Sequence, residues 1–220
     1  MAAYLLPARA VLFDSDGVLV DSDKSVADAW TRWAQTYQLE PRLVAAMVHG
    51  RRASDTVDLL IEPAQRQSAL AAINAIEIED ARSVVGIPGA RDLVASLPAD
   101  AWAVVTSATA ALARARLAAA GIPLPQVLVT ADDVKRGKPA PDGYLAAAAA
   151  LRVPPVEAIV VEDTASGVQA GREAGVALVL GVGVRALASD ADVVVADLRD
   201  VTWADGLVVP RRSVLRAGPS

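Results

Sequence analysis

The pattern of apolar and polar positions divides this chain into two kinds of segment. Short unbroken apolar runs that stop at polar or turn residues are typical of strands buried on both faces of a parallel sheet. Such runs predict strands at residues 10–13, 102–106, 127–129, 158–161, 176–180 and 193–195. Apolar residues at helical spacing predict helices at 91–97, 110–120, 141–151 and 166–174. This alternation predicts an α/β fold with a doubly wound parallel sheet and helices on both faces.

A block of helices separates the first strand from the others. Residues 22–82 contain no strand-like run, and their spacing predicts helices at 25–37, from Pro41, at 55–61 and at 64–81. GIPGAR at 86–91 is typical of a hinge. We therefore expect a discontinuous α/β core of residues 1–21 and 87–220, with an all-helical domain of residues 22–86 inserted in it. The basic tail, 210–220, contains Gly and Pro and is expected to be disordered.

The composition of the chain excludes several kinds of partner and metal site. The 220 residues are 54% hydrophobic, which is enough for a sizeable core. The net charge is −5 and aromatic residues make up 4%, so a nucleic acid is not an expected partner. Without cysteine the chain has no disulfide, thiolate zinc site or cysteine nucleophile, and its single histidine excludes a multi-histidine metal site.

The ends and the apolar segments suggest where the protein works. The N-terminal residues have no basic region and too short an apolar run for a signal peptide. No stretch approaches the ~20 apolar residues that a membrane helix needs. We expect a cytoplasmic protein that does not bind a membrane. We expect it to be a monomer or a weak dimer.

Two carboxylates follow the first predicted strand. Asp14 and Asp16 come directly after it and are followed by Gly17. Side chains at i and i+2 of an extended chain point the same way, so both carboxylates are expected at the carboxyl edge of the sheet, where α/β folds bind ligands. Two like charges so close are costly unless a cation or a shared proton relieves them. The alternative is a strand followed by an ordinary Asp-Gly turn.

Other predicted strands end in polar groups that would reach the same edge. Thr106 and Ser107 end the second strand, Lys138 lies in the loop VKRGKPAPDGY, and Glu162 and Asp163 follow the fourth strand. Each also has an ordinary explanation. Thr106 could cap a helix, Lys138 could be a solvated lysine, and Glu162-Asp163 could be a loop pair that caps the next helix. Their joint placement favours a site. Acidic side chains (Asp14, Asp16, Asp163) suit Mg²⁺, whereas a hydroxyl, backbone amides and a lysine suit a phosphoryl group.

Four segments in order carry a family resemblance. DSDGVLVDS, VVTSAT, RGKPAPDGY and VVEDTASGV resemble the motifs of the haloacid dehalogenase superfamily of phosphatases and phosphomutases. The resemblance extends over residues 10–197 and includes a helical cap inserted in a Rossmann-like core. The amino-acid sequence around the later motifs is similar to that of phosphatases acting on 2-deoxyglucose 6-phosphate, glycerol 3-phosphate and hexitol phosphates.

The resemblance implies a role for each matched residue. Asp14 would be the nucleophile that carries the phosphate, and Asp16 would be the general acid and base. Thr106 and the Ser107 amide would hold phosphoryl oxygens, and Lys138 would neutralise their charge. The implied cofactor is Mg²⁺, held by Asp14, the Asp16 carbonyl and Asp163 directly and by Glu162 through water. Gly17 would let the backbone approach the site.

The chain departs from the family pattern at two positions of the first motif. Val18 stands where many members have Thr, and the Val form is similar to that of β-phosphoglucomutases and some phosphatases. Ser15 stands where bulkier apolar residues are common. Val26 stands where β-phosphoglucomutases place a His in the first cap helix, which favours hydrolysis over mutase chemistry.

The loop HGRRAS is the candidate for substrate recognition by the cap. His49, Gly50 and Arg51 are expected to contact the leaving group, with Arg52 as a further candidate and Arg51 as the first choice. A solvated basic loop is the alternative.

The sequence thus predicts a Mg²⁺-dependent phosphatase of small sugar or sugar-alcohol phosphates that acts through an aspartyl-phosphate. The alternatives are a β-phosphoglucomutase-type enzyme and a non-catalytic sugar-phosphate-binding module.

Overall fold

A seven-stranded sheet forms the centre of the protein, whose computed structural model describes residues 3–217. Its strands, in spatial order, are β12 (Val214–Ala217), β9 (Val193–Val195), β8 (Leu178–Val182), β7 (Ala158–Glu162), β2 (Ala10–Phe13), β5 (Trp102–Val105) and β6 (Val127–Val129). All neighbours pair in parallel except β12, which runs antiparallel to β9. The predicted α/β fold is confirmed, with one antiparallel edge strand added.

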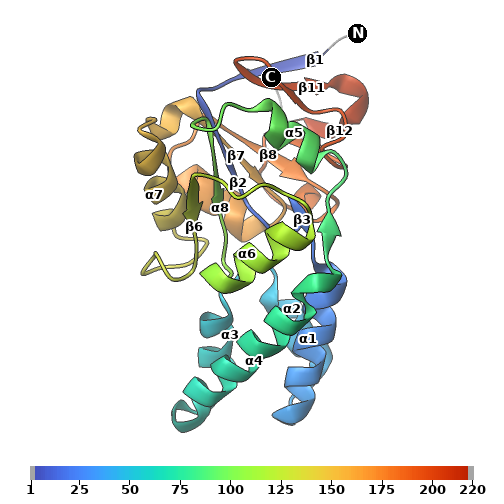
Figure 1. Ribbon diagram of the computed structural model, residues 1–220, viewed down its shortest axis with the longest axis vertical. Coiled ribbons are helices and arrows are strands. Elements are labelled where there is room, and N and C mark those ends of the chain that lie inside the picture. Colours follow the sequence, from blue (N-terminus) through green and yellow to red (C-terminus); the bar gives the residue numbers. More distant parts are fainter. Residues whose placement is uncertain (1–2, 218–220) are drawn as a thin grey trace.

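Helices cover both faces of this sheet, as Figure 1 shows. Side chains alternate along β2: Val11 and Phe13 pack on the face covered by α5 (Ala90–Ser96) and α6 (Ala110–Ala119). Leu12 packs on the opposite face, covered by α7 (Asp142–Leu151) and α8 (Ala165–Glu173). Because both faces are buried, β2 reads as a continuous apolar run rather than an alternating one. Complete burial of a side chain of this size stabilises the fold by about 1.5–3 kcal/mol.

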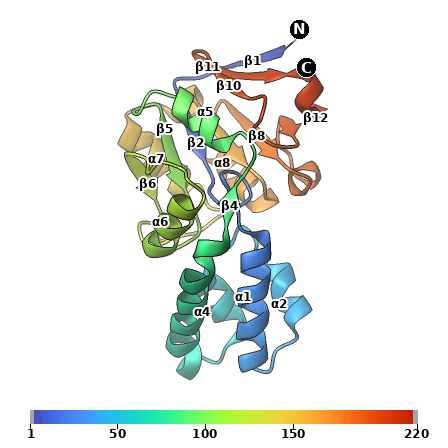
Figure 2. The same ribbon diagram turned by 45° about the vertical axis from the view of Figure 1, so that its right-hand side comes forward.

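The helical block lies at one end of the sheet, beyond the carboxyl ends of the parallel strands (Figures 1 and 2). Its elements are α1 (Asp23–Thr36), α2 (Pro41–Val48), α3 (Ala53–Leu60), η1 (Pro63–Gln65), α4 (Arg66–Asp80) and η2 (Ala81–Ser83). Its apolar core is separate from those of the sheet. Trp33 lies at the centre of this core and donates from its indole nitrogen to the carbonyl of Ala69 at 2.8 Å.

The two chain crossings into and out of the helical block lie side by side. β3 (Val20–Asp21) leads into it and β4 (Val85–Gly86) leads out, and the two pair antiparallel. Figure 2 shows this connection between α4 and the sheet. The paired crossings and the separate core support a domain boundary near residues 22 and 86, which we keep as a proposal.

Most of the C-terminal tail is ordered, so the prediction of disorder is wrong for residues 210–217. β12 extends the main sheet, and Arg216 in it donates to the carbonyls of Leu187, Ser189 and Ala191 at 3.1, 2.8 and 2.8 Å. β12 pairs with β9, whose backbone N–H and C=O groups would otherwise form an unpaired sheet edge. This pairing holds the short basic segment in place. Residues 218–220 lie outside the described residues.

A second sheet was not predicted from the sequence. β1 (Ala3–Pro7) pairs antiparallel with β11 (Gly206–Pro210), which also pairs with β10 (Thr202–Trp203). Each strand is short and two of them end in proline, so none shows a distinct strand pattern. The remaining short helices are η3 (Pro155–Glu157), η4 (Arg185–Ala188) and η5 (Arg211–Ser213).

Several predicted element boundaries are shifted by one or two residues, and two of these shifts are informative. The strand expected at 176–180 is β8 (Leu178–Val182), which runs through Gly181 rather than ending before it. A Cβ at Gly181 would lie 2.8 Å from that of Ala186, so close packing explains a glycine inside this strand. The helix expected at 55–61 begins two residues earlier, as α3 (Ala53–Leu60). Within residues 3–217, none of the helices has the length and apolar character required to cross a bilayer.

Candidate active site

A buried lysine joins two carboxylates at the carboxyl edge of the sheet. Lys138 Nζ lies 2.6 Å from Asp14 Oδ1, 2.6 Å from Glu162 Oε1 and 3.2 Å from the carbonyl of Val105. Its side chain is only 6% exposed, so Lys138 does not extend into bulk solvent. Burial lowers the pKa of Lys138, but Asp14 and Glu162 outweigh it and raise that pKa well above its usual value. Lys138 is therefore a permanent buried cation of the site.

Asp14 is at the end of β2, where the chain leaves the sheet. It is almost completely buried, and its backbone N–H donates to the carbonyl of Val161 on the neighbouring β7. Burial raises the pKa of Asp14 well above the ordinary range, although Lys138 acts against this shift. A further positive charge near Asp14 would favour the ionised form that a nucleophile requires.

A group of three acidic residues could hold a metal ion. One carboxylate oxygen from each of Asp14, Glu162 and Asp163 lies within 4.8 Å of the others. Asp163 Oδ1 is buried and has no hydrogen-bond partner within the described part of the chain. Burial, and next the charge of Glu162, raise the pKa of Asp163 to about 7. Clustered oxygen donors with one free buried lone pair fit a hard divalent cation.

Glu162 differs from the other two because protein donors already occupy both its oxygens. Oε1 accepts from Lys138 and from the hydroxyl of Tyr144, at 2.6 and 3.1 Å. Oε2 accepts from the backbone N–H of Asp163 and Thr164, at 2.8 and 2.9 Å, and from the Thr164 hydroxyl. Burial alone would raise the pKa of Glu162, but Lys138 and these hydrogen bonds lower it. Its geometry suits a supporting role behind Asp14 and Asp163.

The Asp16 carboxylate turns away from this acidic group. Its Oδ1 accepts from the hydroxyl of Ser22 at 2.6 Å and from Arg116 Nη1 at 3.0 Å. Gly17 follows with φ of 82°, and a Cβ there would clash with Asp163 Oδ2. The glycine is therefore required both by the left-handed backbone and by the close approach to Asp163.

Thr106 and Ser107 lie where β5 ends, on the same edge of the sheet. Thr106 is buried, and its hydroxyl accepts from the N–H of Ala108 at 3.1 Å. The Ser107 hydroxyl donates to the carbonyl of Gly50 at 3.2 Å, which links the sheet edge to the helical block. These contacts bring the loop that contains Gly50 directly over the strand ends.

A cavity of about 220 Å³ lies between the sheet edge and the helical block. The predicted site residues that line it are Asp14, Asp16, Thr106, Ser107, Asp163, His49, Gly50 and Arg51. Lys138 and Glu162 lie behind Asp14, as their hydrogen bonds show. Burial, together with the charge of Arg185, lowers the pKa of His49, which favours the neutral form of its ring. The structure thus brings most of the predicted residues to one cavity, with Lys138 and Glu162 directly behind it.

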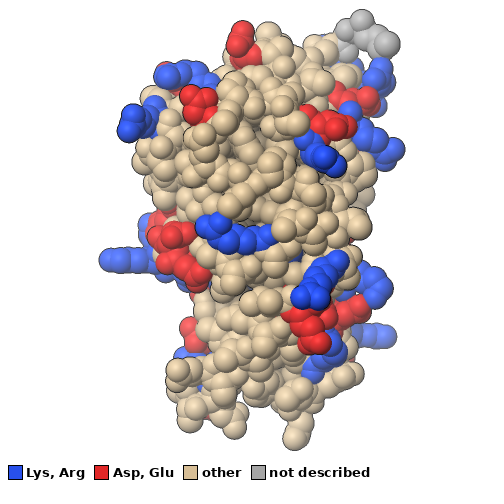
Figure 3. All heavy atoms as spheres, in the orientation of Figure 1, with Lys and Arg blue, Asp and Glu red and all other residues tan. Residues whose placement is uncertain are grey.

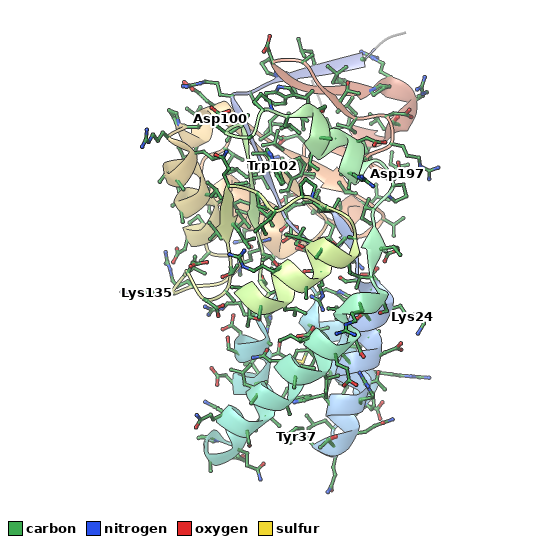
Figure 4. All side chains as sticks on the ribbon, viewed as in Figure 1. Lys24, Tyr37, Asp100, Trp102, Lys135 and Asp197 are labelled. Carbon is green, nitrogen blue, oxygen red and sulfur yellow. The ribbon has the colours of Figure 1, made fainter. Side chains whose placement is uncertain are left out.

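Arg52, a further candidate for substrate contact, is already committed to protein groups. Its guanidinium donates to Asp55 at 2.7 and 2.8 Å and to the carbonyls of Val134 and Lys135 at 3.3 and 3.1 Å. Figure 4 shows Lys135 on the loop beside the helical block. Arg52 therefore connects the helical block to the loop that carries Lys138.

Two site arginines were missed in the sequence. Arg116 is buried in α6, and Arg185 begins η4 and donates to Asp163 Oδ2 at 2.6 and 2.9 Å and to Asp23 Oδ2 at 2.7 Å. One signal was available for Arg116, which follows Leu112 by four positions and so lies on the same face of α6 as that buried leucine. For Arg185 the available signal was its place after the carboxyl end of β8, on the edge that carries the site.

The comparison with known families agrees with this geometry. Residues 8–175 match the family described as haloacid dehalogenase-like hydrolase. The chain belongs to the haloacid dehalogenase-like hydrolase family. The resemblance in its four motifs is thereby confirmed.

Two relatives within this group extend over most of the chain. Hexitol phosphatase A of Escherichia coli is 40% identical over 172 aligned positions, covering 76% of this chain and 80% of that protein. Validoxylamine A 7'-phosphate phosphatase of Streptomyces hygroscopicus subsp. limoneus is 35% identical over 214 residues, covering 89% and 96% of the two chains. This haloacid dehalogenase-like hydrolase thus covers well over two thirds of the length of both relatives.

Solved structures share the fold. β-Phosphoglucomutase of Clostridium difficile superimposes with a TM-score of 0.76 at 21% identity, covering 87% of this chain and 92% of its own. A hydrolase of Pseudomonas syringae superimposes with a TM-score of 0.72 at 25% identity, covering 80% and 84%. The first likeness is one of fold alone.

Proposed function

We propose that this hydrolase is a Mg²⁺-dependent phosphatase that cleaves phosphate monoesters of small sugars or sugar alcohols through an aspartyl-phosphate. The observation that carries the proposal is the pairing of Asp14 with Lys138 at 2.6 Å, beside the unpartnered oxygen of Asp163. A carboxylate nucleophile, a fixed cation and oxygen ligands for a metal are the groups that phosphoryl transfer requires, since it depends on positioning and charge neutralisation.

In the first half of the reaction, an Asp14 oxygen forms a bond to phosphorus and the bond from phosphorus to the leaving oxygen breaks. Asp16 gives its proton to the leaving oxygen, so the sugar departs as a neutral alcohol. In the second half, Asp16 takes a proton from water as the water oxygen bonds to phosphorus and the bond to Asp14 breaks. The position of Asp16 on the cavity wall, with its side chain 28% exposed, supports this double role.

Mg²⁺ when bound supplies positive charge to the phosphoryl oxygens. Asp14, Asp163 and the backbone carbonyl of Asp16 would hold the ion, and Glu162 would support it from behind. The free Oδ1 of Asp163 and the all-oxygen donor set favour Mg²⁺ for this position.

Thr106, the Ser107 backbone amide and the backbone at Gly17 would surround the phosphoryl group. His49, Gly50 and Arg51 line the cavity opposite and would contact the leaving group. A neutral His49 ring suits hydrogen bonds to hydroxyl groups. Relatives named for the phosphates of hexitol, glycerol, 2-deoxyglucose and fructose support a small polyhydroxylated substrate.

The mutase alternative is not favoured. The relatives of higher identity are named phosphatases, and the similarity to β-phosphoglucomutase is one of fold. A non-catalytic binding module would most simply lack one of the central residues, but Asp14, Asp16, Lys138 and Asp163 are all present. Three expectations remain predictions: that the protein is cytoplasmic, that it is a monomer or weak dimer, and that it does not bind nucleic acid. On the face seen in Figure 3, acidic and basic groups are interspersed, which is consistent with that last expectation.

A substrate panel tests the proposal. Phosphate release is measured from hexitol, glycerol, 2-deoxyglucose and fructose phosphates with Mg²⁺, with EDTA, and with the Asp14→Asn variant. We expect release with Mg²⁺ alone. Wild-type protein that is inert across the panel would refute phosphatase activity, and conversion of β-glucose 1-phosphate to glucose 6-phosphate without free phosphate would identify a mutase. Tight Mg²⁺-dependent binding of a sugar phosphate without turnover would identify a binding module.

A further inference from the structure

A buried arginine lies between the predicted general acid and the helical block. Arg116, on α6, donates from Nη1 to Asp16 Oδ1 and from Nη2 to Glu77 Oε1 on α4, each at 3.0 Å. The side chains of Arg116 and Glu77 are only 4% and 7% exposed, and both line the cavity. One guanidinium therefore connects the sheet domain, the helical block and Asp16.

The contact fixes one particular oxygen of Asp16. Ser22 and Arg116 both donate to Oδ1, so the plane of the carboxylate is held from two sides. Within residues 3–217 no hydrogen bond reaches Oδ2, and Asp16 lines the cavity. Oδ2 is consequently the oxygen available to exchange a proton with a bound substrate.

The burial of this ion pair is expensive. Arg116 Nε has no hydrogen-bond partner in the described residues, and burial raises the pKa of Glu77 despite its contact with Arg116. Buried ion pairs often contribute no net stability compared with apolar residues of the same volume. An exposed link between α1 and α4, from Arg32 to Asp80, joins the helices of the block without this cost. The buried arrangement thus points to a purpose other than holding the elements together.

We propose that Arg116 is a positioning residue, which orients Asp16 so that Oδ2 faces the leaving oxygen, and that Glu77 holds the guanidinium in place from the helical block. This inference rests on the proposed phosphatase reaction. Arg116 acts only through Asp16, so its loss should matter most where the departing oxygen needs a proton. Sugar alkoxides need one, whereas p-nitrophenolate departs without it.

The test replaces the pair by apolar residues. In Arg116→Met/Glu77→Met the two most deeply buried charges disappear together, and Asp16, which is 28% exposed, keeps its hydrogen bond from Ser22, so the protein should fold. The quantity measured is kcat/KM, which reports the half-reaction in which the leaving group departs. We expect a loss of about tenfold to a hundredfold with the best sugar or polyol phosphate and under about threefold with p-nitrophenyl phosphate, since a general acid contributes roughly 10²–10⁴-fold.

Controls separate this role from a structural one. Arg32→Met/Asp80→Met removes the exposed pair and should leave the ratio of the two kcat/KM values unchanged. Arg116→Lys keeps a positive charge for Glu77 but cannot bridge both carboxylates. It should therefore also lower kcat/KM for the sugar phosphate more than kcat/KM for p-nitrophenyl phosphate. If the double variant does not fold, this single variant tests the positioning role. Equal losses with both substrates, or none, would overturn the positioning role. Wild-type protein inactive on every phosphate would instead refute the phosphatase proposal.

Discussion

Arg185 donates two hydrogen bonds to Oδ2 of Asp163, and the other oxygen of that carboxylate is buried without a partner among the described residues. The guanidinium thus fixes the orientation of the carboxylate and leaves Oδ1 free. Arg185 also reaches Asp23 at the start of the helical block. The orientation of the predicted metal ligand is in this way connected to the position of the first cap helix.

We predict that Mg²⁺ raises the unfolding temperature through Asp163. Binding at a hundred times the dissociation constant would stabilise the folded protein by about 2.7 kcal/mol. Asp163→Asn should remove most of this shift, because an amide is a weaker metal ligand than a carboxylate. Thermal unfolding with and without Mg²⁺ measures the effect. The exposed Asp190→Asn is the control, and an equal Mg²⁺ shift in both variants would contradict the assignment.

Lys138→Met is predicted to lower both activity and stability. It leaves Asp14 and Glu162 without their shared cation, and breaking a buried ion pair costs roughly 3–5 kcal/mol. Loss of charge neutralisation should also reduce kcat by about 10²–10³-fold. Denaturant unfolding and steady-state kinetics measure the two effects. A folded variant of undiminished stability would show that Lys138 is not the cation these carboxylates require.

Asp14→Asn is predicted to separate activity from stability. The amide cannot form an aspartyl-phosphate, so phosphate release should disappear. Burial raises the pKa of Asp14, which shows that its charge is unfavourable in the metal-free fold, and Lys138 keeps its contact with Glu162. The unfolding temperature without metal should therefore equal or exceed that of the wild type. Retained turnover would rule out Asp14 as the nucleophile.

Arg52→Ala is predicted to weaken substrate binding more than turnover. It removes the contacts from the helical block to the carbonyls of Val134 and Lys135, which lie in the loop that carries Lys138. We expect KM to rise about tenfold, equivalent to roughly 1.4 kcal/mol. Arg66→Ala is the matched control, because Arg66 bonds to the carbonyls of Asp58 and Ile61 inside the helical block. If both variants change KM by the same factor, the contacts of Arg52 to the loop of Lys138 do not affect substrate binding.

Deletion of residues 214–220 is predicted to destabilise the protein and promote aggregation. It removes β12 and exposes the edge of β9. The three hydrogen bonds of Arg216 to backbone carbonyls disappear as well, at about 1 kcal/mol each. Thermal unfolding and light scattering measure the two effects, and Arg216→Met isolates the hydrogen bonds. A truncated protein as stable and monodisperse as the full chain would show that β12 is dispensable.

The sequence by itself determined the elements of the sheet and the residues at its carboxyl edge. The apolar run of β2 and the Asp-x-Asp-Gly turn are local signals, because neighbouring residues along the chain decide them. Parallel strands bring their carboxyl ends to one edge, so Asp14, Lys138 and Asp163 could be assigned to a common site before any coordinates.

Only the tertiary structure decided which partners hold these residues. Arg116 contacts Asp16 from 100 positions away, and Arg185 reaches Asp23 from 162 positions away. Pairings over such distances depend on how helices pack. The local pattern places Arg116 on a buried helix face and Arg185 after a strand end, but it does not indicate which carboxylates they contact. The strands β1, β11 and β12 escaped prediction for the same reason, because strands of such weak pattern are held by hydrogen bonds to distant parts of the chain.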